Sequence, residues 1–304
     1  MSDRAAHAQV FLVALLWGLN WLASKFALAD ISPWFFRTLT FGVGAGNLML
    51  ASRWWGTSMA IAKGMPRLHL AVAGILNIGG FGIFSAFALL ETSVARTSIC
   101  AYTMPIWTTL LARIVLEERL TRARTGALVT GTSGLAVLLW PLFAEGIPIG
   151  ALYALGAAVS WSAGTVYLKW SGVQGHPLAI AAWQLVAGTC AVTIGFLVDG
   201  ADFGNRMDAL SAAGLIYGIF LGTALAYLLW FNLVGRLSAS AAAMGTLMVP
   251  VVGVLASIGF GERPDEADLV GFALIFVASL LALWPAGSDR KVTTRNQARA
   301  GSGT

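Results

Sequence analysis

Long apolar runs separated by short polar connections dominate this chain. A spanning helix needs about 20 mainly apolar residues, and ten runs come close to that length. They cover residues 8–28, 34–52, 68–90, 97–116, 123–141, 148–170, 178–198, 209–233, 239–260 and 267–286. The pattern predicts an all-α integral membrane protein with ten transmembrane helices, and the short connections favour antiparallel neighbours.

Uncommon residues recur along the chain at an offset of 144 positions. The pairs are Trp17/Trp161, Lys25/Lys169, Pro33/Pro177, Glu118/Glu262 and Trp140/Trp284. Because Trp, Lys and Pro are not the residue types that fill apolar runs, their repetition at one offset is not expected by chance. We therefore interpret the chain as two copies of one unit. The sequence thus predicts a first five-helix repeat over 8–141 and a second over 148–286, followed by a polar, basic tail over 287–304 that we expect to be disordered.

The distribution of Lys and Arg predicts how the chain crosses the bilayer. With a cytoplasmic N-terminus, the inner loops and tail hold twelve Lys and Arg residues and the outer loops hold three. Positively charged loops stay in the cytoplasm, so we expect both termini there, in a bacterial inner membrane. A repeat of five helices has an odd number of crossings, so the second repeat is inverted. Inverted repeats around a central cavity are typical of secondary transporters.

Composition supports a membrane protein and argues against several other classes. Charged residues make up 11% of the chain, against roughly 25% in soluble domains, and the mean hydropathy is +0.77. The sequence pI of about 9.6 follows from basic cytoplasmic loops, so no nucleic-acid partner is expected. Cys100 and Cys190 lie in apolar runs and are predicted to be buried thiols. No phosphate-binding glycine loop, metal-ligand motif or nucleophile elbow occurs, so we expect no enzyme, cofactor or metal.

The end of the first run admits a second interpretation. Ala27–Leu28–Ala29 before Asp30 looks like a signal-peptide cleavage site. However, Asn20 and Lys25 interrupt that run, and a matching run occurs in the second half of the chain. We therefore interpret the first run as part of the fold rather than as a signal peptide.

Several short motifs together resemble one family. Leu16–Trp17–Gly18 and Ser160–Trp161–Ser162 precede helices that open with proline, and the fourth helix of each half carries a proline followed by an acidic corner. These are Pro105 before Glu118–Arg119, and Pro250 before Glu262–Arg263, followed by Gly126 and Gly271. Over about residues 8–286 the chain resembles the drug/metabolite transporter superfamily, in its ten-helix EamA type. The resemblance implies that helices 1–4 and 6–9 surround the pathway, that helices five and ten are peripheral, and that the protein is a monomer or homodimer.

The tryptophan-rich helices look most like the YddG-like branch, which exports aromatic and other neutral amino acids. That likeness implies a zwitterionic small-molecule substrate moved by alternating access. An exporter of other metabolites or drugs, with or without proton coupling, remains an alternative, as do a polytopic membrane enzyme and a structural scaffold.

The first helix carries the main candidate site. Trp17, Asn20, Trp21 and Ser24 recur at helical spacing and share a face, with Lys25 at its edge. We interpret this face as a cavity wall, with the rings contacting a substrate side chain and Asn20 and Ser24 orienting it. The alternative is hydrogen bonding between helices. Lys25 is expected to receive a substrate carboxylate, to gate the outer mouth or to snorkel to the interface.

Helix breaks supply the second group of candidates. Pro105 and Pro250 each remove a backbone donor and free a carbonyl four residues earlier, at Ala101 and Thr246. Broken helices at matching positions point to a transporter site, although a plain kink is an equal alternative. The remaining substrate-binding candidates are aromatic or polar residues of central helices: Asn77, Tyr102, Trp107, Trp161, Thr165, Tyr227 and Thr246. No carboxylate lies deep in any run, so we expect uniport rather than proton coupling.

Overall fold

A computed structural model describes residues 3–118, 120–145, 148–204, 206–234 and 247–283. In this part of the chain every regular element is a helix. The first half contains α1 (Asp3–Ala27), α2 (Pro33–Trp54), α3 (Met65–Gly74), the π-helix η1 (Ile75–Gly80), α4 (Phe81–Glu91), α5 (Val94–Ala101), α6 (Met104–Val115) and α7 (Arg122–Glu145). The second half contains α8 (Ile149–Ser171), α9 (Pro177–Val198), α10 (Ala209–Ile216), the π-helix η2 (Tyr217–Leu225), α11 (Ala226–Val234), α13 (Met248–Gly259) and α14 (Glu266–Leu283).

The apolar runs correspond in order to these helices. Within the described ranges, six helical stretches are long and apolar enough to cross a membrane: Ala8–Ala27, Met65–Glu91, Val94–Val115, Ile149–Ser171, Pro177–Val198 and Ala209–Trp230. Three of the predicted runs divide into shorter elements, because π-helices interrupt two of them and a turn at residues 102–103 interrupts the third. Of the predicted helix 239–260, the described part is α13, and the tail 287–304 lies outside the described residues.

Local sequence explains where several helices begin. Ser32 and Ser93 each accept a hydrogen bond from the backbone N–H three residues later, which satisfies a donor that the first turn leaves unpaired. Pro33 and Pro177 stand in the first turn of α2 and α9, where the missing N–H costs nothing. The polar and proline-bearing connections thus set the ends of the spans.

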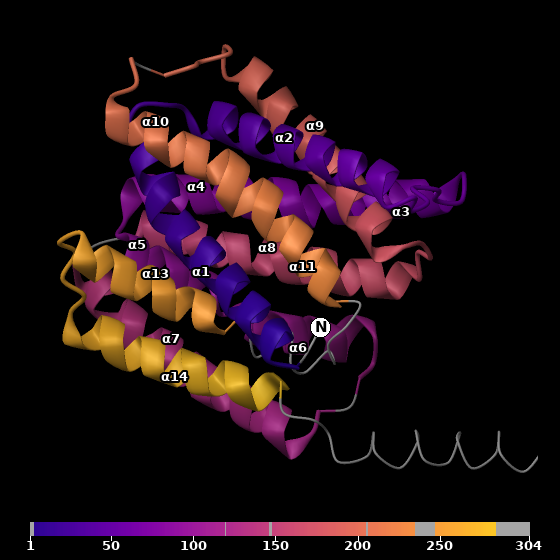
Figure 1. Ribbon diagram of the computed structural model, residues 1–304. Helices are drawn as coiled ribbons and strands as arrows, with labels where there is room; N and C mark the ends of the chain where they lie inside the picture. Colours follow the sequence, from indigo (N-terminus) through magenta and orange to yellow (C-terminus); the bar gives the residue numbers. More distant parts are fainter. Residues whose placement is uncertain (1–2, 119, 146–147, 205, 235–246, 284–304) are drawn as a thin grey trace, which may run out of the picture.

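Glycines allow the closest helix contacts. Gly18 of α1 faces Val249 and Val252 of α13 so closely that a side chain there would overlap them. Gly134 and Gly271 bring α7 and α14 together, and Figure 1 shows these two helices side by side along one edge of the bundle. This edge position agrees with the peripheral role that was expected for the fifth and tenth helices.

The outer surface of the bundle is apolar. Large hydrophobic side chains such as Leu50, Ile194 and Val277 are exposed on it, as expected where lipid replaces water. Cys100 is buried as predicted, but the prediction was wrong for Cys190, which is exposed on α9. An apolar run of sequence does not distinguish the protein-facing side of a spanning helix from its lipid-facing side.

Candidate functional site

A cavity of about 690 Å³ lies between the helices of both halves of the chain. Both π-helices line it, together with residues of α1, α2, α4, α6, α7, α8, α9, α11 and α13. A volume of this size fits a small metabolite. η1 contributes Asn77 and Ile78 and η2 contributes Gly222 and Thr223, and π-helical turns in otherwise α-helical segments are frequent at functional sites.

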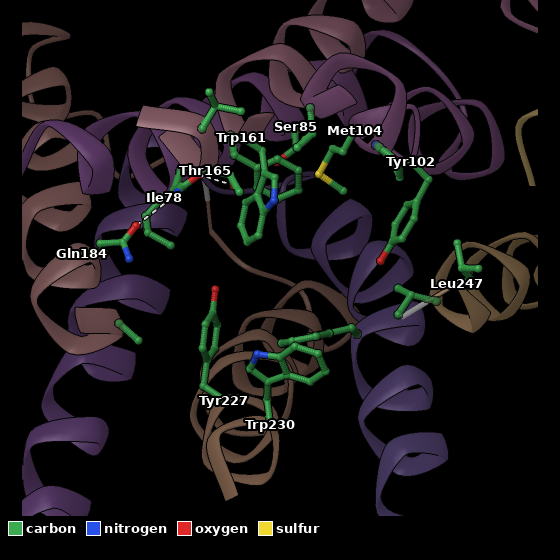
Figure 2. A pocket seen from close by; sticks show the side chains of 18 of the residues that line it. Ile78, Ser85, Tyr102, Met104, Trp161, Thr165, Gln184, Tyr227, Trp230 and Leu247 are labelled. Atoms are coloured by element: carbon green, nitrogen blue, oxygen red, sulfur yellow. Dashed lines mark hydrogen bonds between the residues drawn. The ribbon is translucent and has the colours of Figure 1, made fainter. Parts of the chain in front are cut away.

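Two groups of aromatic rings form the apolar part of the wall. Trp17 packs against Tyr227 and Trp230, with ring centroids 5.7 and 5.4 Å apart. Phe81 packs against Trp21 at 6.3 Å and against Trp161 at 5.3 Å. Figure 2 shows the ring of Trp161 and the hydroxyl of Tyr227 pointing into the same space. Rings from α1, α4, α8 and α11 therefore surround one volume suited to an apolar or aromatic group.

Polar atoms on the wall fall into satisfied and unsatisfied groups. Asn77 donates to Gln184 at 2.8 Å and accepts from Thr165 at 3.2 Å, which ties η1 to α8 and α9. In contrast, Oδ1 of Asn20 and Oγ of Ser24 are buried and have no hydrogen-bond partner among the described residues. A buried acceptor without a partner is costly, and both residues line the cavity, where a ligand could supply the missing donor.

Arg37 lies on the cavity wall although it is only 6% exposed. Its Nε donates to the carbonyl of Gly82 at 2.9 Å and its Nη2 to Oγ of Ser85 at 3.0 Å. In the described part of the chain, no carboxylate lies within ion-pair distance of it. The wall therefore carries a buried positive charge that no carboxylate of the described residues neutralises.

Charged residues stand at one end of the cavity, beyond the end of α6. Glu118, Arg124 and Lys169 line this end. Lys169 donates to Oε1 of Glu118, and Arg124 pairs with Oε2 at 3.0 Å. The hydrogen bond from Lys169 lowers the pKa of the Glu118 carboxyl, with the nearby charges acting in the same direction. Lys169 is 67% exposed in its side chain, so we interpret this end as the open mouth.

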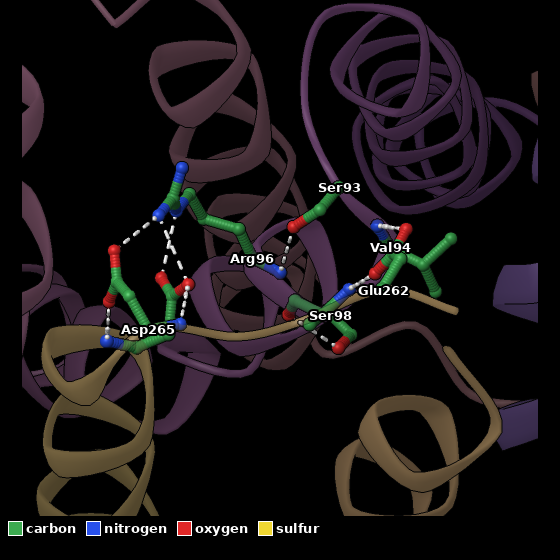
Figure 3. Close-up of polar contacts among 8 residues, drawn as sticks. Ser93, Val94, Arg96, Ser98, Glu262 and Asp265 are labelled. Carbon is green, nitrogen blue, oxygen red and sulfur yellow. Dashed lines mark hydrogen bonds and ion pairs between the residues drawn. The ribbon is translucent and has the colours of Figure 1, made fainter. Parts of the chain in front are cut away.

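Polar contacts close the opposite end, where α1 finishes and α5 begins. Nζ of Lys25 donates to the carbonyls of Leu89 and Thr92. The carboxylate of Glu262 accepts from the backbone N–H groups of Val94 at 2.8 Å and Ala95 at 3.1 Å. Figure 3 shows this contact at the first turn of α5. These contacts join α1 to the end of α4, and the chain after α13 to the start of α5.

A second ion-pair group holds α5 to α14 at the closed end. Arg96 donates from Nε to Oδ1 of Asp268 at 2.8 Å and from Nη2 to Oδ2 at 3.0 Å, and it also pairs with Asp265 at 3.2 Å. Such a two-pronged arginine–carboxylate contact is geometrically specific. In Figure 3 the Arg96 side chain turns toward Asp265, away from Glu262. The closed end thus depends on two separate polar contacts to α5.

The structure places most of the predicted site residues on the cavity wall. These are Trp17, Asn20, Trp21, Ser24, Asn77, Tyr102, Pro105, Trp161, Thr165 and Tyr227. Lys25 is engaged at the closed end, and the Trp107 indole donates to Thr103 at 3.1 Å; neither lines the cavity. Pro250 is buried in the first turn of α13, next to the lining residue Val249. Thr246 lies outside the described residues.

The predicted break in the fourth helix occurs, but it serves the cavity differently than expected. The helix is interrupted at Tyr102 and Thr103, and Pro105 stands at the start of α6. Ala101, whose carbonyl Pro105 was expected to free, is fully buried and does not line the cavity. The break instead brings the ring of Tyr102 to the wall, as Figure 2 shows.

Sequence reasoning overlooked several lining residues. In the sequence Arg37 had the appearance of a charge near a helix end, without a role at the site, and Phe81, Gln184 and Trp230 carried no separate signal. Helical spacing gave one usable clue, since Tyr227 and Trp230 are three residues apart and share a face. Among the described residues, no group of three or more His, Cys, Asp or Glu side chains is arranged to hold a metal.

Known proteins resemble the chain over most of its length. An uncharacterized transporter of Bacillus subtilis, YvbV, is 29% identical over 291 residues, which is 92% of this chain and 91% of that protein. A probable amino-acid metabolite efflux pump of Salmonella typhimurium is 27% identical over 283 residues, or 87% and 90% of the two chains. A solved crystal structure superposes with a TM-score of 0.63 at 24% identity, covering 92% of this chain and 98% of that one. This last likeness concerns the fold alone.

The family assignment rests on two matches within the chain. Residues 5–140 and, again, residues 148–284 match the EamA-like transporter family. The two ranges correspond to the two halves that share the cavity. The relatives are transporters rather than enzymes, and the apolar spans agree with a multi-pass protein embedded in the bilayer. The chain belongs to the EamA-like transporter family.

Proposed function

We propose that this transporter exports neutral and aromatic amino acids from the cytoplasm by alternating access, as a uniporter in a bacterial inner membrane. The observation that carries the proposal is the composition of the cavity wall. Aromatic rings such as Trp17 and Trp161 suit an apolar side chain, and the unpartnered oxygens of Asn20 and Ser24 suit an ammonium group. A cavity with both features matches an amino acid of the kind that the YddG-like branch exports.

Two of the relatives support the same substrate class. The proteins of Salmonella typhimurium and Escherichia coli that are 27% and 25% identical to this chain are both named probable amino-acid metabolite efflux pumps. Export of other metabolites or drugs is the alternative. Within the described residues the cavity has no carboxylate deeper than Glu118 at its mouth, which disfavours cationic drugs and also a proton relay.

The two ends of the cavity support alternating access between inverted repeats. Glu118 and Glu262 are related by the offset of 144, and they lie at opposite ends of the bundle, beyond the end of α6 and at the start of α5. The same offset carries η1 (Ile75–Gly80) onto residues 219–224, inside η2 (Tyr217–Leu225). Because basic residues favour the cytoplasmic side, we take the open mouth at Lys169 as the cytoplasmic one.

Reconstituted transport tests the proposal. Purified protein in proteoliposomes is loaded with unlabelled amino acid, and uptake of labelled L-tryptophan, L-phenylalanine, L-leucine, L-lysine and L-glutamate by exchange is measured, with empty liposomes as the background. We expect exchange of the first three and little of the charged pair. Trp17→Ala is expected to weaken exchange of L-tryptophan more than that of L-leucine, because the wall loses a ring. Absence of exchange for every amino acid, with labelled drug-like cations moving instead, would overturn the proposal.

A further inference from the structure

Arg37 is a buried cation that has no carboxylate within ion-pair distance among the described residues. It stands in the second turn of α2, which begins at the closed end, so its guanidinium lies toward the deep end of the cavity. A charge inside a bilayer costs on the order of 2.5–3.5 kcal/mol on insertion scales and usually marks a functional site. In the described chain, Arg96, Arg124 and Lys169 each pair with a carboxylate, whereas Arg37 does not.

The surroundings hold the guanidinium in place without neutralising it. The Gly82 carbonyl and the Ser85 hydroxyl occupy Nε and Nη2. The guanidinium carbon lies 4.8 Å from the Phe36 ring centre and 5.5 Å from that of Phe41, within the range of cation–π contacts. Guanidinium has five N–H donors in a rigid plane, so donors remain beyond these two neutral hydrogen bonds. A planar cation fixed in this way is preorganised for the two oxygens of a carboxylate.

We propose that Arg37 receives the carboxylate of the substrate and thereby selects carboxylated molecules over amines and cations. The inference rests on the proposed amino-acid export and names the group that recognises the acid end. Lys25, the earlier candidate for that role, donates to the carbonyls of Leu89 and Thr92 instead. A purely structural Arg37 that only fastens α2 to α4 predicts no preference between acids and amides.

Competition among indole compounds separates the two roles. Exchange of labelled L-tryptophan in proteoliposomes is measured against unlabelled indole-3-propionate, which has the carboxylate without the ammonium, and against L-tryptophanamide, which has the reverse. With wild-type protein we expect indole-3-propionate to compete at least roughly tenfold more strongly than the amide, since a charge-assisted pair is lost with the amide. Equal competition by the two compounds would overturn the inference directly.

Variants then assign the preference to Arg37. Arg37→Gln keeps a donor for the Gly82 carbonyl and removes the charge, so the KM for L-tryptophan is expected to rise roughly 10- to 100-fold and the preference for the acid to vanish. Arg37→Lys keeps the charge and is expected to retain part of that preference. Retention in this variant would show that the loss in Arg37→Gln comes from the missing charge and not from misfolding. Arg113→Gln removes an exposed arginine that does not line the cavity, and it should leave the preference intact.

The outcomes distinguish this inference from the proposed function. A wild-type protein that exchanges L-tryptophan, together with an Arg37→Gln variant that keeps the same preference for the acid, overturns the role of Arg37 alone. A wild-type protein that exchanges no amino acid overturns the proposed function and the inference with it. Loss of the preference in Arg37→Gln but not in Arg113→Gln supports the inference.

Discussion

Replacing Glu262 by Gln is expected to open the closed end of the cavity. The Glu262 carboxylate accepts hydrogen bonds from the N–H groups of Val94 and Ala95, which are among the four donors that the first turn of α5 leaves without helical partners. Its negative charge also lies at the positive end of the helix dipole. Gln offers one acceptor instead of two and carries no charge, so the closed end loses a hydrogen bond and an electrostatic contact.

The expected shift follows from those two contributions. A hydrogen bond to a charged group contributes about 1.5–3 kcal/mol when it is fully desolvated, and the dipole term adds about 0.3–1 kcal/mol. Glu262 is only partly buried, so the lower end of these ranges applies. A net loss of about 1.5 kcal/mol corresponds to a roughly tenfold increase in the population that is open at this end.

Thiol labelling from outside the cell measures that population. Ser24 lines the cavity next to Lys25 and is 1% exposed, so a cysteine there reacts with a membrane-impermeant maleimide from outside only when the closed end opens. Cys100 and Cys190 are first replaced by Ser and Ala to remove the background. Glu262→Gln is expected to raise the labelling rate of Ser24→Cys roughly tenfold.

The control removes the same charge from the same end of the molecule. Glu266 starts α14 and is exposed, and its side chain makes no hydrogen bond or ion pair in the described structure. Glu266→Gln should therefore leave the labelling rate near that of the parent. Equal rates in the Glu262→Gln variant and the parent would refute the reasoning, and so would an equal increase in both glutamine variants.

Three further outcomes follow from the structure. Gly222→Val should raise the KM for substrate several-fold, because a side chain there overlaps the Asn20 amide and overpacking costs about 1–3 kcal/mol. Gly46 has open space beside it, so Gly46→Val should leave the exchange kinetics unchanged. At a pH above 4.5, the ordinary pKa of the Glu118 carboxyl, Lys169→Gln should destabilise the protein by less than about 1 kcal/mol. Because folding lowers the pKa of Glu118, the difference in thermal unfolding temperature between variant and wild type should shrink as the pH falls through the lowered pKa of the folded protein. An inward or outward proton gradient, imposed at clamped voltage and constant substrate gradient, should not change the export rate, and acceleration would show that a proton is coupled.

Helical periodicity made the α1 wall predictable from the sequence. Trp17, Asn20, Trp21 and Ser24 are spaced so that they share a face, and polar side chains within a span avoid lipid, so that face had to meet the interior. The structure places all four on the cavity wall. Contact of each with substrate stays a prediction until transport is measured.

The omissions arise where the site depends on contacts distant in sequence, whereas the error at Trp107 has a local cause. Trp107 was a candidate as an aromatic residue of a central helix, but its indole donates to Thr103, four residues earlier. Arg37 looked like any charge near a helix end, because its partners Gly82 and Ser85 lie 45 and 48 positions away. No local pattern shows whether a cation in a span snorkels to the interface or faces a cavity.

The contacts of equivalent residues also indicate how the opposite state is built. The offset of 144 matches Lys25 with Lys169 and Glu118 with Glu262. At the open end Lys169 pairs with Glu118, whereas at the closed end Lys25 and Glu262 each bind backbone atoms near α5. If the repeats exchange states, Lys25 pairs with Glu262 when the closed end opens. An exposed pair of this kind contributes only about 0–1 kcal/mol, less than the helix-terminus contacts that it replaces. Glu262→Gln therefore still favours opening. Lys25→Gln added to it costs no further ion pair in the open state, but it removes the hydrogen bonds from Lys25 to the Leu89 and Thr92 carbonyls of the closed end. The double variant should therefore label faster than Glu262→Gln alone, and an equal or lower rate would contradict the role of Lys25 in closing this end.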